Sequence, residues 1–143
     1  MSTIEERQAH RARVAPGVAV GVTEAMICEL VHAFYGRVRQ DPELGPVFER
    51  AIDDWDEHLA KLCDFWSSVI LMTGRFSGSP MAAHARRDDI APEHFARWLE
   101  LFAETARAVS PPDAAALFIA RSQAIGRRLQ LGLGISRREP PPP

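Results

Sequence analysis

WDEHLAKLCDFWSSVILM, residues 55–72, places apolar side chains at steps of three and four residues, the period of a helix with one buried face. His58 lies on such an apolar track together with Leu62, Phe65 and Val69. An imidazole buried among apolar side chains must find a hydrogen-bond partner, or stand neutral against an unusual neighbour. This stretch therefore predicts a long core helix that faces something other than ordinary core.

Helical periods and helix-end signals extend through most of the remaining chain. Thr23 and Pro92 are suited to start helices, Pro42 disfavours helical geometry at the residue before it, and Gly74 is a natural left-handed helix end. The predicted long helices cover about 23–40, 53–74, 92–109 and 112–131, with short ones at 42–50 and 80–87. No segment alternates as a strand would, so the expected fold class is all-α around one core.

Composition and charge fit a single globular domain of 143 residues. We expect a flexible leader over 1–20, a helical domain over 21–134 and a proline-rich tail over 135–143. No apolar run approaches the roughly 20 residues that span a bilayer, which predicts a cytoplasmic protein without membrane contact. The net charge of -2 and the scattered arginines disfavour nucleic-acid binding. Cys28 and Cys63 form no metal or redox motif and are expected in the core.

The predicted core is rich in aromatic side chains and faces a weakly patterned segment that contains His84. A flat, apolar cofactor between the long helix and this segment would explain that inventory. Haem iron takes a neutral imidazole on one face, and hydrogen-bond donors tune the other face. Tyrosine, histidine and tryptophan are available for this purpose in Tyr35, His58 and Trp98.

Four separated motifs point to a known family. They are FYGRVRQDPELGPVF (34–48), W-x-x-H followed by FW (55–66), GSPMAAH (78–84) and HFARWLELF (94–102). In this order and spacing the chain resembles the group III truncated haemoglobins of bacteria, over about residues 23–131. The resemblance implies a shortened globin in which two helices cross over two, with haem b between them.

The resemblance also implies roles for individual residues. His84 matches the iron ligand, and Tyr35, His58 and Trp98 match the distal residues that face a bound ligand. Lys61 matches a position that pairs with a haem propionate, for which Arg86 and Arg87 are alternatives. The remaining residues expected to contact the cofactor are Phe34, Phe48, Leu62, Phe65, Trp66, Met81 and Phe95. The run ARRDDIAPEH that follows the proximal histidine departs from the family pattern.

Plainer interpretations exist for each position. His84 is also readable as an exposed loop histidine, with His94 as its nearest competitor for iron. His58 and Tyr35 are also compatible with ordinary hydrogen-bonded core residues. Lys61 is compatible with a solvated helix flank.

The function that follows is reversible binding of oxygen, or of another small diatomic such as nitric oxide or carbon monoxide, at ferrous iron. An alternative is a haem enzyme that detoxifies peroxide, nitric oxide or reactive nitrogen species with a separate reductase. A haem-free helical interaction module is a third interpretation. The residue types favour the first, because they supply hydrogen-bond donors for a bound ligand.

Overall fold

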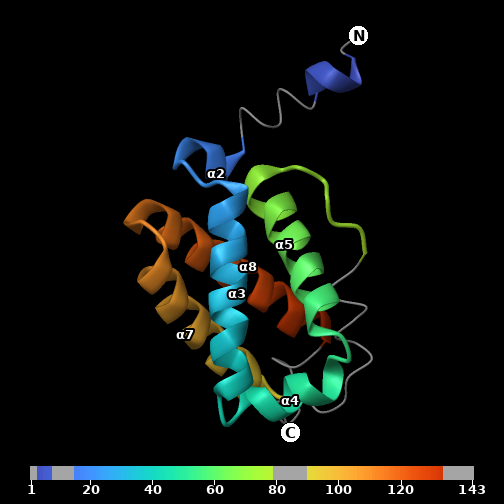
Figure 1. Cartoon of the computed structure of the whole chain (residues 1–143), viewed down its shortest axis with the longest axis vertical. Coiled ribbons are helices and arrows are strands. Elements are labelled where there is room, and N and C mark those ends of the chain that lie inside the picture. The colour runs from blue at the N-terminus through green and yellow to red at the C-terminus, as the bar shows by residue number, and fades with distance from the viewer. Residues whose placement is uncertain (1–2, 8–14, 79–89, 134–143) are drawn as a thin grey trace, which may run out of the picture.

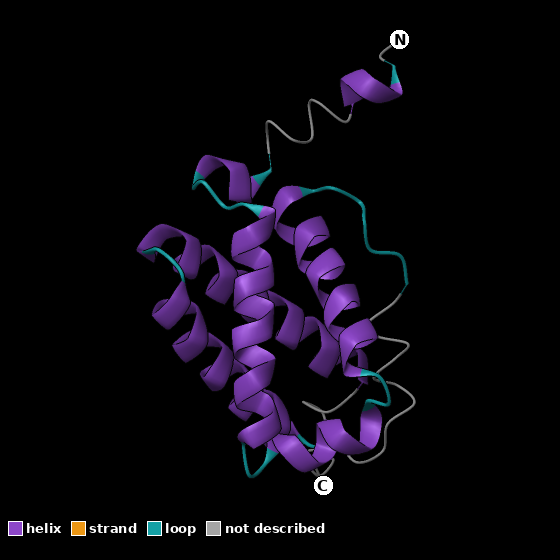
Figure 2. Cartoon of the chain, viewed as in Figure 1, coloured by secondary structure: helices purple, strands orange, loops and turns teal. Residues whose placement is uncertain are grey.

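The computed structural model describes residues 3–7, 15–78 and 90–133, and every regular element within these ranges is a helix (Figures 1 and 2). The helices of the packed body are α2 Pro16–Ala19, α3 Glu24–Gln40, α4 Leu44–Ala51, α5 Trp55–Leu71, α7 Pro92–Val109 and α8 Pro112–Leu133. The predicted all-α class is confirmed. The short helix expected over 80–87 lies outside the described residues.

The long helices form two layers of two. In Figure 1, α3 and α5 lie side by side, with α8 crossing behind them and α7 along the other flank of α3. Contacts join α3 to α5, α3 to α7, and α7 to α8. Phe34, Phe102 and Phe118 are fully buried where these helices meet. The structure thus has the expected two-over-two arrangement, and α4 forms the corner between α3 and α5.

Local chemistry sets most helix ends. The Thr23 side chain accepts a hydrogen bond from the Met26 amide at 3.2 Å, and Asp54 accepts from the Glu57 amide at 3.1 Å. The predicted end of α5 at Gly74 is wrong. The helix stops at Leu71 because Met72 itself turns left-handed, with a φ of 56°.

The turn after α5 is tied back to the helix bundle by the hydroxyls of Ser67, Ser68 and Thr73. Ser67, which is fully buried, donates to the Glu24 carboxylate at 2.6 Å and lies 2.7 Å from the Thr73 hydroxyl. The Phe76 amide donates to Ser68 at 2.9 Å. These bonds fix the chain leaving α5 against the start of α3.

The short helix α2 packs directly on α5. Ala15 and Gly17 are buried, and a Cβ added at Gly17 would lie 2.8 Å from the Ile70 carbonyl oxygen. Only glycine permits this approach of the two backbones. Residues 15–22 therefore contribute to the core, whereas the division of the chain into leader, domain and tail stays a prediction.

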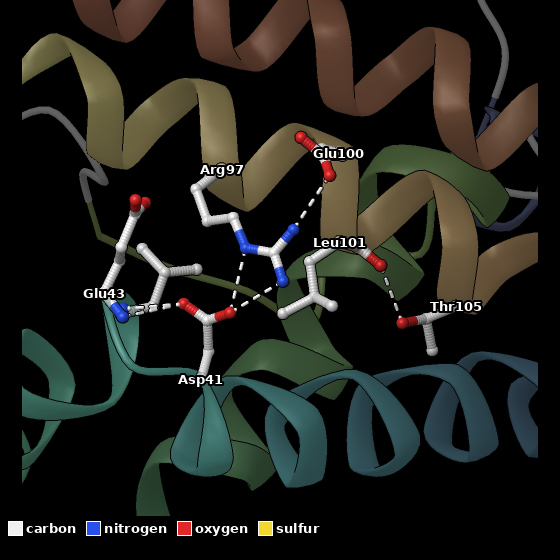
Figure 3. Close-up of polar contacts among 7 residues, drawn as sticks. Asp41, Glu43, Arg97, Glu100, Leu101 and Thr105 are labelled. Atoms are coloured by element: carbon white, nitrogen blue, oxygen red, sulfur yellow. Dashed lines mark hydrogen bonds and ion pairs between the residues drawn. The ribbon is translucent and has the colours of Figure 1, made fainter.

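Asp41 holds together the corner between α3, α4 and α7 (Figure 3). Its Oδ2 accepts hydrogen bonds from the Leu44 amide at 2.9 Å and the Glu43 amide at 3.1 Å. Its Oδ1 lies 2.8 Å from both Nε and Nη2 of Arg97, which also pairs with Glu100 at 2.9 Å. The Asp41 side chain is only 3% exposed, so this is a buried charge that depends on its donors.

These donors make the stability of the protein sensitive to acid. Burial by itself would raise the pKa of Asp41, but the hydrogen bonds from Arg97, Leu44 and Glu43 together hold this pKa below its ordinary value. A carboxyl group whose pKa is depressed in the folded state stabilises that state above its unfolded pKa of about 3.9. This contribution is lost as the pH falls through the lower, folded-state pKa.

We therefore expect Arg97→Met to lower the free energy of unfolding at pH 7, because it leaves the buried Asp41 carboxylate without its cation. Urea unfolding at pH 7 and at pH 4 measures the effect. Without Arg97 the pKa of Asp41 rises, so the carboxyl is protonated at the lower pH and the difference from the unsubstituted protein shrinks. The exposed Arg107 on the same helix provides the control Arg107→Met. A difference that does not change with pH would contradict this account.

Candidate functional site

Four aromatic and imidazole side chains from three helices meet near the α3–α5 contact. We call Tyr35 of α3, Trp55 and His58 of α5, and Trp98 of α7 the ring cluster. The Tyr35 ring centroid lies 5.6 Å from that of His58 and 6.3 Å from that of Trp55, and the latter two are 5.8 Å apart. The structure therefore brings together the three predicted distal residues, and Trp55 joins them.

Tyr35 is placed to donate a hydrogen bond into this cluster. The Trp98 side chain, which can only donate, gives a hydrogen bond to the Tyr35 hydroxyl oxygen. Burial raises the pKa of Tyr35 well above its ordinary value, and the bond from Trp98 opposes this only in part. The phenol therefore keeps its proton. Because a hydroxyl accepts and donates at once, that proton is available to a bound molecule.

Phe34 sets the spacing between the two partners of this hydrogen bond. Its ring meets Tyr35 edge-on at 4.8 Å and Trp98 edge-on at 5.0 Å, and it is 1% exposed. Phe48 of the corner helix covers Tyr35 at 5.7 Å. Both residues therefore contact the Tyr35 ring, and their contact with a cofactor stays a prediction.

His58 is neutral, and its hydrogen-bonding capacity is not fully used by the described residues. Burial lowers its pKa, and the positive charge of Lys61 lowers it further. Its Nε2 is buried, as is the indole Nε1 of Trp55, and neither nitrogen has a hydrogen-bond partner in the part of the chain that the structure describes. Buried polar groups are nearly always hydrogen-bonded in native proteins. Two such nitrogens in contacting rings leave the cluster with unused hydrogen-bonding capacity for a polar ligand.

Apolar surface beside the ring cluster is suited to a flat cofactor. Leu62, Phe65 and Trp98 are only half-buried, although each packs against the core. A porphyrin would cover such side chains, and its ligand would meet the polar atoms of the cluster. The described residues therefore fit haem on its distal side.

Three other residues predicted to contact the cofactor make their described contacts away from Tyr35. Trp66 stacks on Phe102 at 5.1 Å in the core between the helix layers. Phe95 packs with Leu129 in a separate apolar cluster. Lys61 is exposed and forms an ion pair with Glu57 at 3.1 Å. None of these three residues is among those that surround Tyr35.

The proximal side of the predicted site is outside the described residues. It includes His84, Met81 and Arg86, so their roles stay predictions. His94, the competitor for iron, has its Nδ1 accepting the Ala91 amide at 2.9 Å, which caps the start of α7. Among the described residues no group of three or more histidine, cysteine or acidic side chains is arranged to hold a metal ion.

Two features of the structure were not predicted from the sequence: Trp55 in the ring cluster and the contact between Cys28 and Cys63. Trp55 was not among the predicted site residues, although its position three residues before His58 puts both on one helix face. Cys28 and Cys63 are neighbours, and both are free thiols. Burial, followed by the hydrogen bond with Cys28, raises the pKa of Cys63 to about 12. This favours an unreactive thiol, as a core residue would have.

No helix in the described part of the chain combines the length and the apolar character needed to cross a membrane.

Comparisons with known proteins identify the family. No protein-family model matches the chain. A group 3 truncated haemoglobin of Campylobacter jejuni is 33% identical over 113 residues, which cover 76% of this chain and 89% of that protein. A crystal structure of group III truncated haemoglobin from Campylobacter jejuni superposes with a TM-score of 0.74, covering 78% of this chain and 91% of the other. The truncated globin fold and the resemblance are thus confirmed, and the chain belongs to the group III truncated haemoglobins.

Proposed function

We propose that this protein holds haem b and reversibly binds oxygen, or another small diatomic ligand, at ferrous iron. The family implies a haem cofactor and a small gaseous ligand. The observation that supports oxygen is the Tyr35 hydroxyl, which burial keeps protonated and which Trp98 orients. Such a donor stabilises a ligand that takes up partial negative charge.

Haem supplies the iron at which a diatomic ligand binds, and the chain supplies its surroundings. We propose that His84 would supply the imidazole that binds the iron. Phe34, Phe48, Leu62 and Phe65 would cover the distal face of the porphyrin. Trp66, Met81 and Phe95 would complete the apolar contacts, with Lys61 or Arg86 on a propionate.

The ring cluster would act on the ligand by donation and by exclusion of water. Tyr35 would donate a hydrogen bond through its hydroxyl, while the bond from Trp98 restricts rotation of that hydroxyl. His58 is neutral, so its Nε2 is able to donate without introducing a full charge. These bonds act in a mostly apolar surrounding, where each is stronger than in water.

The ferrous state needs an electron source. We therefore include in the proposal a separate reductase in the cytoplasm, as a partner that the described residues do not identify. We propose ligand binding as the primary function, because the described cluster supplies hydrogen-bond donors for a bound ligand.

The iron ligand is tested by absorption spectroscopy. The purified protein is expected to show the Soret band of bound haem, and His84→Ala is expected to lose it or to bind haem far more weakly. His32, which is exposed and lies 2.8 Å from the Cys28 carbonyl oxygen, provides the control His32→Ala. An unchanged spectrum in the His84 variant would reject this assignment.

The distal donor is tested by ligand kinetics. Tyr35→Phe removes one hydrogen bond to a partly charged ligand, worth about 1.5 kcal/mol, and should raise the oxygen dissociation rate by roughly tenfold. Carbon monoxide carries less negative charge, so its dissociation rate should change much less. Stopped-flow measurement of both rates makes the comparison. Equal oxygen dissociation rates in the two proteins would exclude donation by Tyr35.

A further inference from the structure

Trp55 contains a buried donor that the proposed site does not yet use. Its indole Nε1 has no hydrogen-bond partner among the described residues, although the atom is shielded from solvent. An indole nitrogen can donate but cannot accept. Since this donor is not satisfied by described protein atoms, a bound molecule is the natural acceptor.

The indole ring is held in place from two sides. It meets His58 edge-on, with ring centroids 5.8 Å apart and planes at 90°, and it contacts Tyr35 at 6.3 Å. The Arg39 guanidinium lies over the ring, 4.6 Å from its centroid, and Arg39 pairs with Glu49 at 3.3 Å. Trp55 is therefore positioned by Arg39 of α3, which pairs with Glu49 of α4, as well as by its own helix.

Trp55 Nε1 and His58 Nε2, which lack hydrogen-bond partners among the described residues, belong to rings that touch each other and Tyr35. Because His58 is neutral, its Nε2 can either donate or accept, whereas Trp55 always donates. One electron-rich ligand beside the three rings would therefore satisfy the Trp55 donor and the Tyr35 proton together.

We propose that Trp55 is a further ligand-binding residue, whose indole N–H donates a hydrogen bond to the same partly negative diatomic ligand as Tyr35. This inference rests on the proposed function and sharpens its ligand class. Two fixed donors favour oxygen, whose bound form is the stronger acceptor, over carbon monoxide. Trp55 thereby becomes a residue that determines ligand specificity.

The test compares Trp55→Phe with the unsubstituted holoprotein. Phenylalanine keeps an aromatic ring and removes the N–H. The oxygen dissociation rate should rise about three- to tenfold, while the carbon monoxide dissociation rate should stay within about twofold. The infrared C–O stretching frequency of the carbon monoxide complex should also move to higher wavenumber, because it senses the loss of a nearby positive dipole. A role in packing alone would leave that frequency in place.

Arg39→Gln is the matched control. It removes the cation that covers the outer face of the ring but keeps the indole donor. Because the N–H remains, its oxygen dissociation rate and C–O frequency should change clearly less than those of Trp55→Phe. If this variant reproduced the effects of Trp55→Phe, ring placement rather than donation would be responsible, and the proposal would be overturned.

A measurement on the unsubstituted protein covers the case in which Trp55→Phe does not fold. The indole proton of Trp55 is identified in nitrogen-15 spectra by its nuclear Overhauser contacts with the His58 ring. Its signal should move downfield in the oxygen complex relative to the carbon monoxide complex, and no movement would overturn the proposal. A normal Soret band together with an unchanged oxygen dissociation rate in Trp55→Phe would refute this inference alone. Absence of a Soret band from the unsubstituted protein refutes the proposed function.

Discussion

The hydrogen bond from Trp98 to the Tyr35 hydroxyl is the contact on which the described site depends. It crosses between the two helix layers, because Tyr35 is on α3 and Trp98 is on α7. Phe34 packs edge-on against both rings, and the Arg97 pair with Asp41 fixes the same two helices one residue away from Trp98. The spacing of these helices is therefore set by the partly exposed Arg97–Asp41 ion pair and by the buried ring of Phe34.

The ring cluster is less self-sufficient than the rest of the core. Asp41 and Ser67, both buried, have hydrogen-bond partners within the protein, whereas the Trp55 and His58 nitrogens have none among the described residues. Replacing such groups by apolar ones would remove a desolvation cost. Local departures from full hydrogen bonding are typical of functional sites, where stability is exchanged for binding. The location of these nitrogens thus agrees with ligand binding beside Tyr35.

Helices could be predicted from the sequence because their signals are local. Thr23, Asp54 and Pro92 start helices through side-chain and backbone chemistry that depends on only a few neighbours. The end of α5 could not be placed in this way. Met72 and Gly74 both adopt the left-handed backbone conformation that ends helices. The helix ends with Met72 as its C-cap residue, and the next residue, Thr73, is bonded to the buried Ser67 hydroxyl. The burial of the Trp55 indole nitrogen likewise depends on how α3 packs over α5, which no local pattern encodes.

The charge state of the cluster limits which ligands it can favour. Tyr35 keeps its proton and His58 is neutral, because burial disfavours the charged form of each. Lys61, whose charge also acts on His58, is exposed and paired with Glu57 outside the ring cluster. The ring cluster therefore offers oriented neutral dipoles instead of a net positive charge. Such dipoles stabilise a ligand that becomes partly negative only when bound, and they give a free anion less advantage than a buried cation would.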